Sequence, residues 1–331
     1  MESRLQPVGR ATTSSSPMNS EAYIEQELKA GCRAHYNQGV WWHSHYAGGC
    51  KTVLPFQQIV PGSATPRLAK SLLGYNHLAP RDACPAGLAA FYLLRGQALN
   101  AYSLESLNDG KRRAILKAQR AGIVISRITS LEPLWEDLRA LAMSATARTG
   151  YGKPAEFYRT HFQQWQESLR KEFAKPDREW WGAFHQEKLG AYMYGYLVDG
   201  TMHLANVKIH ADFVKQHAGD LLLYSLVEYS KTLNTCSQVD VGRRSPNSPS
   251  VDKWKELHGF ERVEFGEHYC YRLPMRMALR CLLRWSRDGG QAQPAFAAEN
   301  NAGSLVHRLR RRAVQMAERI GPSLQDSRLQ S

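Results

Sequence analysis

The chain has 331 residues, of which 43% are apolar and 22% are charged, a composition typical of folded globular proteins. This excludes a largely disordered chain and leaves room for two domains of ordinary size. The formal net charge of +13 favours anionic partners such as phosphates, nucleic acid or an acidic lipid surface. More than half of this charge lies in the tail, where eleven arginines and four acidic residues follow position 271. The rest of the chain is only mildly basic, which argues against nucleic-acid binding as the main function.

The six cysteines form no C-x-x-C pair and no zinc-type spacing, so we expect reduced thiols. No apolar stretch approaches the roughly 20 residues that a membrane span requires. Residues 11–20, ATTSSSPMNS, are too polar for the core of a signal peptide. These features predict a cytoplasmic protein in which residues 1–19 form a disordered extension.

The first hundred residues contain short candidate elements. We expect Ser20 to cap a helix with the sequence EAYIEQELKA, and strands over residues 40–46 and 51–60. Pro66 is placed to open a helix. Residues 87–94, GLAAFYLL, fit a buried strand and a buried helix equally well, because they have no clear periodicity.

The pattern becomes clearer from residue 111. Residues 111–120 keep Ala114, Ile115 and Ala118 on one face, which predicts an amphipathic helix, and Gly122 is placed to end it. A strand is expected over 123–128, followed by helices over 133–143 and 155–171.

The remaining elements alternate strands and helices. Strands are expected over 180–184, 189–198, 201–208, 238–241 and 261–271, and helices over 218–233 and 251–258. The Asp199-Gly200 pair between two of these strands predicts a tight hairpin. This order is typical of a mixed α/β fold.

A strand followed by Lys215-Gln216-His217-Ala218-Gly219-Asp220 and then by an apolar-faced helix is a candidate anion site. The first amides of a helix have no partner within it, and the helix dipole favours negative charge there. We expect Gly219 to permit close approach of a phosphate. A glycine at this kind of turn also occurs without any ligand.

This segment resembles the carrier-binding motif of GNAT acyltransferases, [QR]-x-x-G-x-[GA], with Gln216 and Gly219 at the matching positions and Leu221 in place of the final small residue. Lys253 to Phe260, KWKELHGF, is similar to the family's later helix that ends in Gly-Phe. The basic helix followed by Ala121-Gly122, and the strand end VDVG at 239–242, resemble the FemAB-like or CelD-like branch.

The resemblance implies a GNAT fold in which backbone amides of residues 215–220 grip the pyrophosphate of acetyl-CoA or another acyl-CoA. It also implies two GNAT-like halves packed together. We therefore expect a degenerate first half over residues 20–105, an acyltransferase domain over 106–275 and a basic helical tail over 276–331.

Acyl transfer requires proton transfer at the acceptor, so titratable residues at strand ends near this turn are candidate catalytic groups. Asp240 could act as a base, or could merely cap the turn at Gly242. His203 and His210 flank the preceding strand, although strand histidines are often bonded to the backbone. Tyr269 and Tyr271 lie where the resemblance implies a general acid, and also fit as ordinary packed tyrosines.

Two other polar groups have simpler interpretations. His43 and His45, beside Trp42, form an H-x-H pair without a third ligand, so no metal site is expected. The run Lys111-Arg112-Arg113 could line a phosphate channel, but such runs are usually solvated helix faces.

Together these features predict an acyltransferase that uses acyl-CoA or a related carrier and acts on an amine or hydroxyl of a sugar, amino acid or cell-envelope precursor. Two alternatives stay open: aminoacyl transfer from tRNA to a peptidoglycan precursor, and a binding protein without catalysis. Basic helices over 276–287 and 304–320, joined by a linker over 288–303, could hold the protein on the anionic inner face of the membrane.

Overall fold

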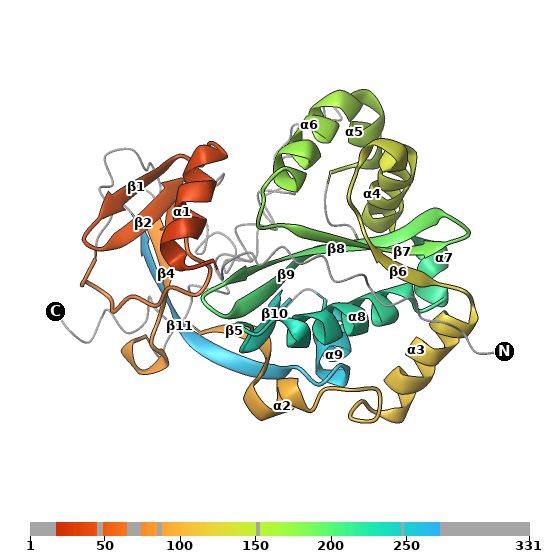
Figure 1. The fold of residues 1–331 in the computed structure, drawn as a ribbon. Coiled ribbons are helices and arrows are strands. Elements are labelled where there is room, and N and C mark those ends of the chain that lie inside the picture. Colours follow the sequence, from red (N-terminus) through yellow and green to blue (C-terminus); the bar gives the residue numbers. More distant parts are fainter. Residues whose placement is uncertain are drawn as a thin grey trace, which may run out of the picture. The chain divides into compact units, whose positions relative to one another are not determined.

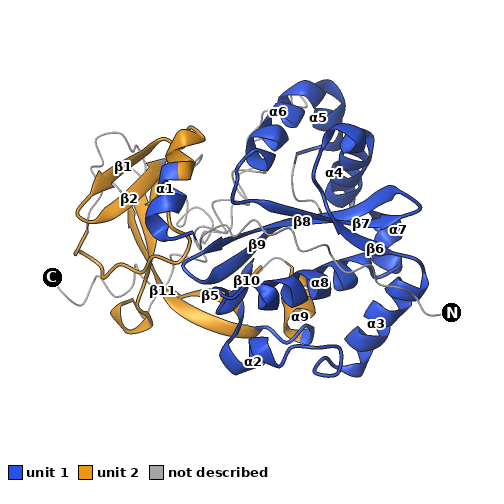
Figure 2. Ribbon diagram, viewed as in Figure 1, with its two compact units in different colours: residues 1–25, 93–242, 257–260 blue, residues 26–92, 243–256, 261–331 orange. Residues whose placement is uncertain are grey.

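The structure is a computed structural model that describes residues 18–44, 49–64, 74–84, 88–149, 153–245 and 248–271. Residues 1–17 of the expected extension over 1–19, the helix at Pro66, His45 and the tail over 276–331 lie outside these residues. The chain divides into two compact units (Figure 2), which consist of residues 1–25, 93–242 and 257–260 (unit 1) and of residues 26–92, 243–256 and 261–331 (unit 2). The domain boundaries expected from the sequence stay a prediction.

The sheet of unit 1 has the strand order β10-β9-β8-β7-β6. Its strands are β6 (Val124–Arg127), β7 (Glu179–His185), β8 (Lys188–Val198), β9 (Thr201–Ile209) and β10 (Gln238–Arg243), whose last residue belongs to unit 2. Neighbouring strands from β6 to β9 are antiparallel, whereas β9 and β10 are parallel. The expected hairpin joins β8 to β9, because Asp199 and Gly200 both adopt the positive φ angles that a tight two-residue turn requires.

Helices cover both faces of this sheet (Figure 1). On one face lie α4 (Trp135–Thr149), α5 (Ala155–Thr160) and α6 (Phe162–Phe173). Their core includes Leu138, Leu141, Trp180, Leu189 and Tyr192. On the other face α8 (Ala218–Thr232) packs on β7 and contacts α3 (Asp109–Arg120) and α2 (Gly96–Asn100). A short helix, α7 (Ala211–Lys215), precedes α8, and the turn η3 (Glu132–Leu134) precedes α4.

Unit 2 contains the strand order β1-β2-β3-β4-β11-β5. These strands are β1 (Ala34–Asn37), β2 (Val40–Ser44), β3 (Gly49–Thr52), β4 (Gly74–Ala79), β5 (Leu88–Arg95), whose last three residues belong to unit 1, and β11 (Glu261–Tyr271). Trp42, Cys50 and Tyr75 form its buried core. The helices α1 (Ser20–Lys29) and α9 (Pro249–Leu257) each begin in one unit and end in the other, and the turn η2 (Arg81–Ala83) follows β4.

The expected mixed α/β class is confirmed, one open alternative is decided, and three local predictions need correction. The segment at 87–94 is the strand β5, and the strand expected over 51–60 ends at Thr52. The helix expected over 155–171 is broken at His161, which leaves the helical region. At α1 the capping oxygen is Asn19 Oδ1, which accepts from the Ala22 amide at 2.9 Å, rather than that of Ser20.

In the part of the chain that the structure describes, no helix is long and apolar enough to cross a membrane. Within the same residues, no group of three or more histidine, cysteine or acidic side chains could hold a metal ion. The described cysteines, at positions 32, 50, 84, 236 and 270, form no disulfide with one another.

Candidate functional site

The two parallel strands of unit 1 separate part-way along their length. β10 pairs with β9 only from Gln238–Thr201 to Asp240–His203, although β9 continues to Ile209. Two local features accompany the separation. In β9, the pairing with β8 contains a bulge near Asn206, whose φ is 53°. In β10, Gly242 has a φ of 86°. Since bulges bend a strand away from its neighbour, β9 and β10 diverge directly after the His203–Asp240 pair.

His203 and Asp240 form a buried pair at this point. They are register partners, so their side chains lie on the same face of the sheet. His203 Nδ1 lies 3.1 Å from Asp240 Oδ2, and the residues are only 5% and 7% exposed. The other carboxylate oxygen accepts from the Gly242 amide at 2.8 Å. One oxygen of Asp240 thus caps the turn, as the second interpretation expected, and the other contacts the histidine. The role of Asp240 as a base stays a prediction.

This arrangement suits the histidine for proton transfer. A carboxylate at Nδ1 favours the tautomer with its proton on Nδ1, which places the lone pair of the neutral ring on Nε2. If the ring takes up a proton, the carboxylate stabilises the imidazolium that forms. Burial strengthens this interaction because water screens it less. The pair can therefore accept a proton at Nε2 and release it again.

The ring of His203 stacks on Tyr196, with ring centroids 5.0 Å apart. Tyr196 in turn contacts the Arg178 guanidinium, which lies 3.9 Å from the centre of its ring and 5.7 Å from that of Tyr23. Glu172 accepts from Arg178 Nε at 2.8 Å, and the side chain of Asp177 pairs with the same guanidinium. This packed group holds Tyr196, and through it the plane of the His203 ring.

The structure places the six residues of the predicted carrier turn differently from the sequence interpretation. β9 does not run directly into the long helix, because the five-residue helix α7 intervenes and ends at Lys215. His217 adopts a left-handed conformation at the start of α8, and Ala218, Gly219 and Asp220 are buried in its first turn. Lys215 is exposed, whereas Gln216 and His217 are partly exposed.

Gly219 serves internal packing. A Cβ atom built at this position would lie 2.3 Å from Ile209 Cδ1, so the space that the missing side chain leaves is taken by β9. Gly219 alone therefore gives no evidence of a ligand, and binding of a carrier by residues 215–220 stays a prediction. Lys215, Gln216 and His217 are the members of the turn whose side chains are exposed enough to contact the phosphates of a donor.

The side chain of Asp220 is also buried and is bonded to other residues of unit 1. Its Oδ1 accepts from Lys111 Nζ at 2.7 Å and lies 2.9 Å from His258 Nε2, and its Oδ2 lies 3.3 Å from His217 Nδ1. Burial alone would raise the pKa of Asp220, but the hydrogen bonds from His258 and Lys111 and the charge of Lys111 outweigh it and hold the pKa below its ordinary value. Lys111 thus belongs neither to a channel nor to a solvated face, whereas Arg113 is exposed.

The other predicted residues lie elsewhere. Tyr269 is on β11 in unit 2, opposite Asn76 on β4. His210 starts α7, where its Nδ1 accepts from the Asp212 amide at 3.4 Å. His43 is on β2, and the side chain of Tyr271 is outside the described part.

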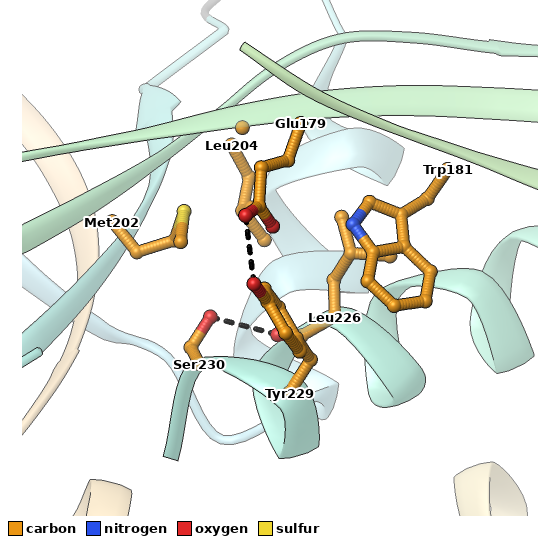
Figure 3. A pocket seen from close by; sticks show the side chains of 8 residues that line it. Glu179, Trp181, Met202, Leu204, Leu226, Tyr229 and Ser230 are labelled. Atoms are coloured by element: carbon orange, nitrogen blue, oxygen red, sulfur yellow. Dashed lines mark hydrogen bonds between the residues drawn. The ribbon is translucent and has the colours of Figure 1, made fainter. Parts of the chain in front are cut away.

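A narrow pocket lies between α8 and the strands β7, β8 and β9 (Figure 3). Its empty space, including solvent at its mouth, is about 170 Å³, and it is too narrow to admit a water molecule. Tyr229 points into it and donates to Glu179 Oε1 at 2.7 Å. The sequence did not indicate this contact, because nothing in the local pattern shows that positions 50 residues apart meet across the sheet.

Comparison with known proteins supports the fold. Residues 109–256 match the acetyltransferase (GNAT) domain family. The C-terminal domain (DUF2156) of a candidate lysylphosphatidylglycerol synthetase from Agrobacterium fabrum is similar in structure, with a TM-score of 0.51 and 11% identity over 78% of this chain and 91% of that one. This chain has the GNAT fold. FemX is similar as well, with a TM-score of 0.50 and 10% identity over 78% of this chain and 92% of the FemX chain.

No curated protein sequence matches the chain. The domain match and the shared fold confirm the GNAT fold expected from the sequence and support a transferase. At identities this low, the structural likeness carries information about the fold alone.

Proposed function

We propose that this protein transfers an acyl group from acetyl-CoA, another acyl-CoA or a related carrier to an amine or hydroxyl, and that His203 and Asp240 handle the proton of the acceptor. The observation that carries the proposal is the buried His203–Asp240 pair at the point where β9 and β10 separate. A buried histidine held by a carboxylate is more than a non-catalytic binding domain requires. It therefore favours an enzyme over a scaffold.

The proposed chemistry assigns a role to each side chain. The donor supplies an activated acyl carbon. The acceptor nitrogen or oxygen forms the new bond to that carbon while its proton moves to Nε2 of His203, and Asp240 stabilises the resulting imidazolium. The bond between the acyl carbon and the carrier breaks, and the proton on His203 is then available to the departing group. The stacked Tyr196 restricts rotation of the imidazole ring during both transfers.

The Asp240→Asn variant tests this role because it preserves the turn. The amide oxygen of asparagine can still accept from the Gly242 amide, while its NH₂ group would face Nδ1 of His203 and favour the opposite tautomer. We expect kcat to fall by about 10²- to 10⁴-fold, the usual contribution of a general base, with little change in KM for the donor. The assay is thiol release from acetyl-CoA in the presence of candidate amines and hydroxyl compounds.

Two further variants help to interpret the result for Asp240→Asn. His203→Gln should lose activity to a similar degree, and Asp240→Ala should also lose stability because it removes the cap of Gly242. Circular dichroism separates loss of activity from unfolding. If folded Asp240→Asn and His203→Gln turn over at the wild-type rate, the pair has no part in the chemistry.

A second candidate donor is an aminoacyl-tRNA, which the FemAB-like resemblance implies. The observation that favours it is the exposed face of α3, where Arg113, Lys117 and Arg120 recur every three or four residues and therefore lie on one side of the helix. Such a face can contact phosphates of a nucleic acid. Measuring transfer by the same protein preparation with acetyl-CoA and with charged tRNA decides between the two donors.

For the acceptor we propose a sugar, an amino acid or a cell-envelope precursor. We also propose that the protein acts in the cytoplasm and that the basic tail over 276–331 brings it to the inner face of the membrane. Both proposals rest on the charge and on the resemblance noted in the sequence.

A further inference from the structure

A row of polar residues crosses one face of the sheet in unit 2. Lys51 on β3 is the register partner of Asn76 on β4, and Asn76 is the partner of Tyr269 on β11. His43 on β2 continues the row beyond Lys51. Because residues directly opposite one another share a face, these side chains lie on one side. The alternate residues Trp42, Cys50 and Tyr75 form the buried core on the other side.

Arg243 brings a second cation to this face. Its guanidinium pairs with Glu267 Oε2 and hydrogen-bonds to the side chain of Tyr269. Glu267 and Tyr269 are two residues apart on β11 and therefore point to the same side of the sheet. Glu267 is only 6% exposed, so its buried carboxylate holds the guanidinium against the sheet. The guanidinium thus lies on the same face as Lys51.

Lys51 has no ion-pair or hydrogen-bond partner among the residues that the structure describes, although it is only partly exposed. Burial lowers the pKa of its ammonium group, and the nearby charge of Arg243 lowers it further, while the Cys32 thiol acts in the opposite direction. A partly buried ammonium group beside a second cation is unfavourable for stability unless something compensates it. A protein tolerates such an arrangement where the cations serve to bind an anion.

We infer that Lys51, Asn76, Arg243 and Tyr269, which we call the Lys51 cluster, bind the phosphate group of a small molecule. Lysine contributes a point charge with three donors, and the arginine fork matches an oxyanion in two directions. The Asn76 amide and the Tyr269 hydroxyl add neutral donors from the neighbouring strands. A phosphate group presents three terminal oxygens to these donors, whereas a carboxylate presents only two.

This inference does not depend on the proposed acyl transfer. It gives Tyr269 a binding role in place of the catalytic one expected from the sequence. The ligand could be inorganic phosphate or a phosphate monoester, because both present the same terminal oxygens, and the experiment distinguishes them.

The test is isothermal titration calorimetry of the full-length protein, in separate experiments with inorganic phosphate, glycerol 3-phosphate and acetate. We expect both phosphates to bind and acetate to bind much more weakly; tighter binding of the ester would identify a phosphorylated metabolite as the ligand. Lys51→Gln should weaken phosphate binding by about tenfold or more, as expected for loss of a charge-assisted contact. Lys253→Gln is the matched control, since Lys253 belongs to the same unit and its side chain is 66% exposed.

Thermal unfolding gives a second readout, which does not require tight binding. Phosphate should raise the melting temperature of the wild type by mass action. Lys51→Met should melt higher than the wild type without phosphate, because it removes an uncompensated charge, and phosphate should no longer raise its melting temperature.

Equal phosphate affinity in the wild type and Lys51→Gln would overturn the inference, and so would a wild type that binds no phosphate by either method. Asp240→Asn should bind phosphate like the wild type. Failure of this site and failure of the proposed catalytic pair are therefore distinguishable.

Discussion

The contact between Asp220 and Lys111 should be one of the most sensitive points of unit 1. The exposed fractions of the two side chains are 9% and 15%, and their charged atoms lie 2.7 Å apart. Asp220→Asn would leave the ammonium group of Lys111 without its counter-ion. Removing one partner of a buried pair costs about 3–5 kcal/mol of stability. Because Lys111 retains some exposure, we expect a loss near the lower limit, about 3 kcal/mol.

The assay is urea unfolding followed by circular dichroism, for Asp220→Asn, Lys111→Met and the double variant. The double variant removes both charges, so its loss should be smaller than the sum of the two single losses by at least about 1 kcal/mol. Glu156→Gln is the control, because it breaks an exposed pair with Arg159 whose side chains are 67% and 60% exposed. We expect this control to change stability by less than about 1 kcal/mol.

The pH dependence gives an independent check. The pKa of Asp220 is lower in the folded protein than its ordinary value of about 3.9. The stabilisation is therefore complete above the ordinary value and is lost as the pH falls toward the folded value. The difference in unfolding free energy between the wild type and Asp220→Asn should be smaller at pH 3 than at pH 5. If Asp220→Asn costs no more than Glu156→Gln, or if the single losses simply add, the pair does not stabilise unit 1 as argued.

Two glycines provide further predictions by urea unfolding. A Cβ at Gly190 would lie 1.8 Å from Cδ1 of the buried Phe213 ring. Gly190→Ala should therefore lower the free energy of unfolding by about 3 kcal/mol or more. If its loss and that of Phe213→Ala simply add in the double variant, the clash is not the cause. At Gly219 the obstacle is only the tip of Ile209. Adding Gly219→Ala to an Ile209→Val background should therefore raise stability by up to about 1 kcal/mol, as alanine is the better helix former; a less stable double variant would mean that the glycine is needed for another reason.

Local signals predicted those parts of the fold that depend on neighbours in sequence. The helix over 111–120 and its end at Gly122 were predicted because its apolar residues share a face and Gly122 can adopt its φ of 79°. The hairpin at Asp199-Gly200 was predicted for the same kind of reason. The break at His161 was missed because the apolar periodicity continues through it, and α7 was missed because five residues are too few to show a period.

The candidate site was predicted only in part. His203 and Asp240 were both named as candidates, but their contact depends on the parallel register of strands 37 residues apart, which no local pattern encodes. The role of Gly219 could not be decided from the sequence for a related reason. A glycine required by a ligand and one required by a packed side chain look the same in sequence, and only the position of Ile209 distinguishes them.

The division of the chain into interleaved segments has a consequence for synthesis on the ribosome. Unit 1 needs residues 257–260, which supply His258, and unit 2 needs β11, which ends at Tyr271. Since a nascent chain emerges from its N-terminus, neither unit can complete its fold until most of the protein has been translated. Until then, the apolar strands β4 and β5 lack their neighbour β11. We therefore expect nascent chains that stall before residue 257 to depend on chaperones, and released full-length chains to lose that dependence.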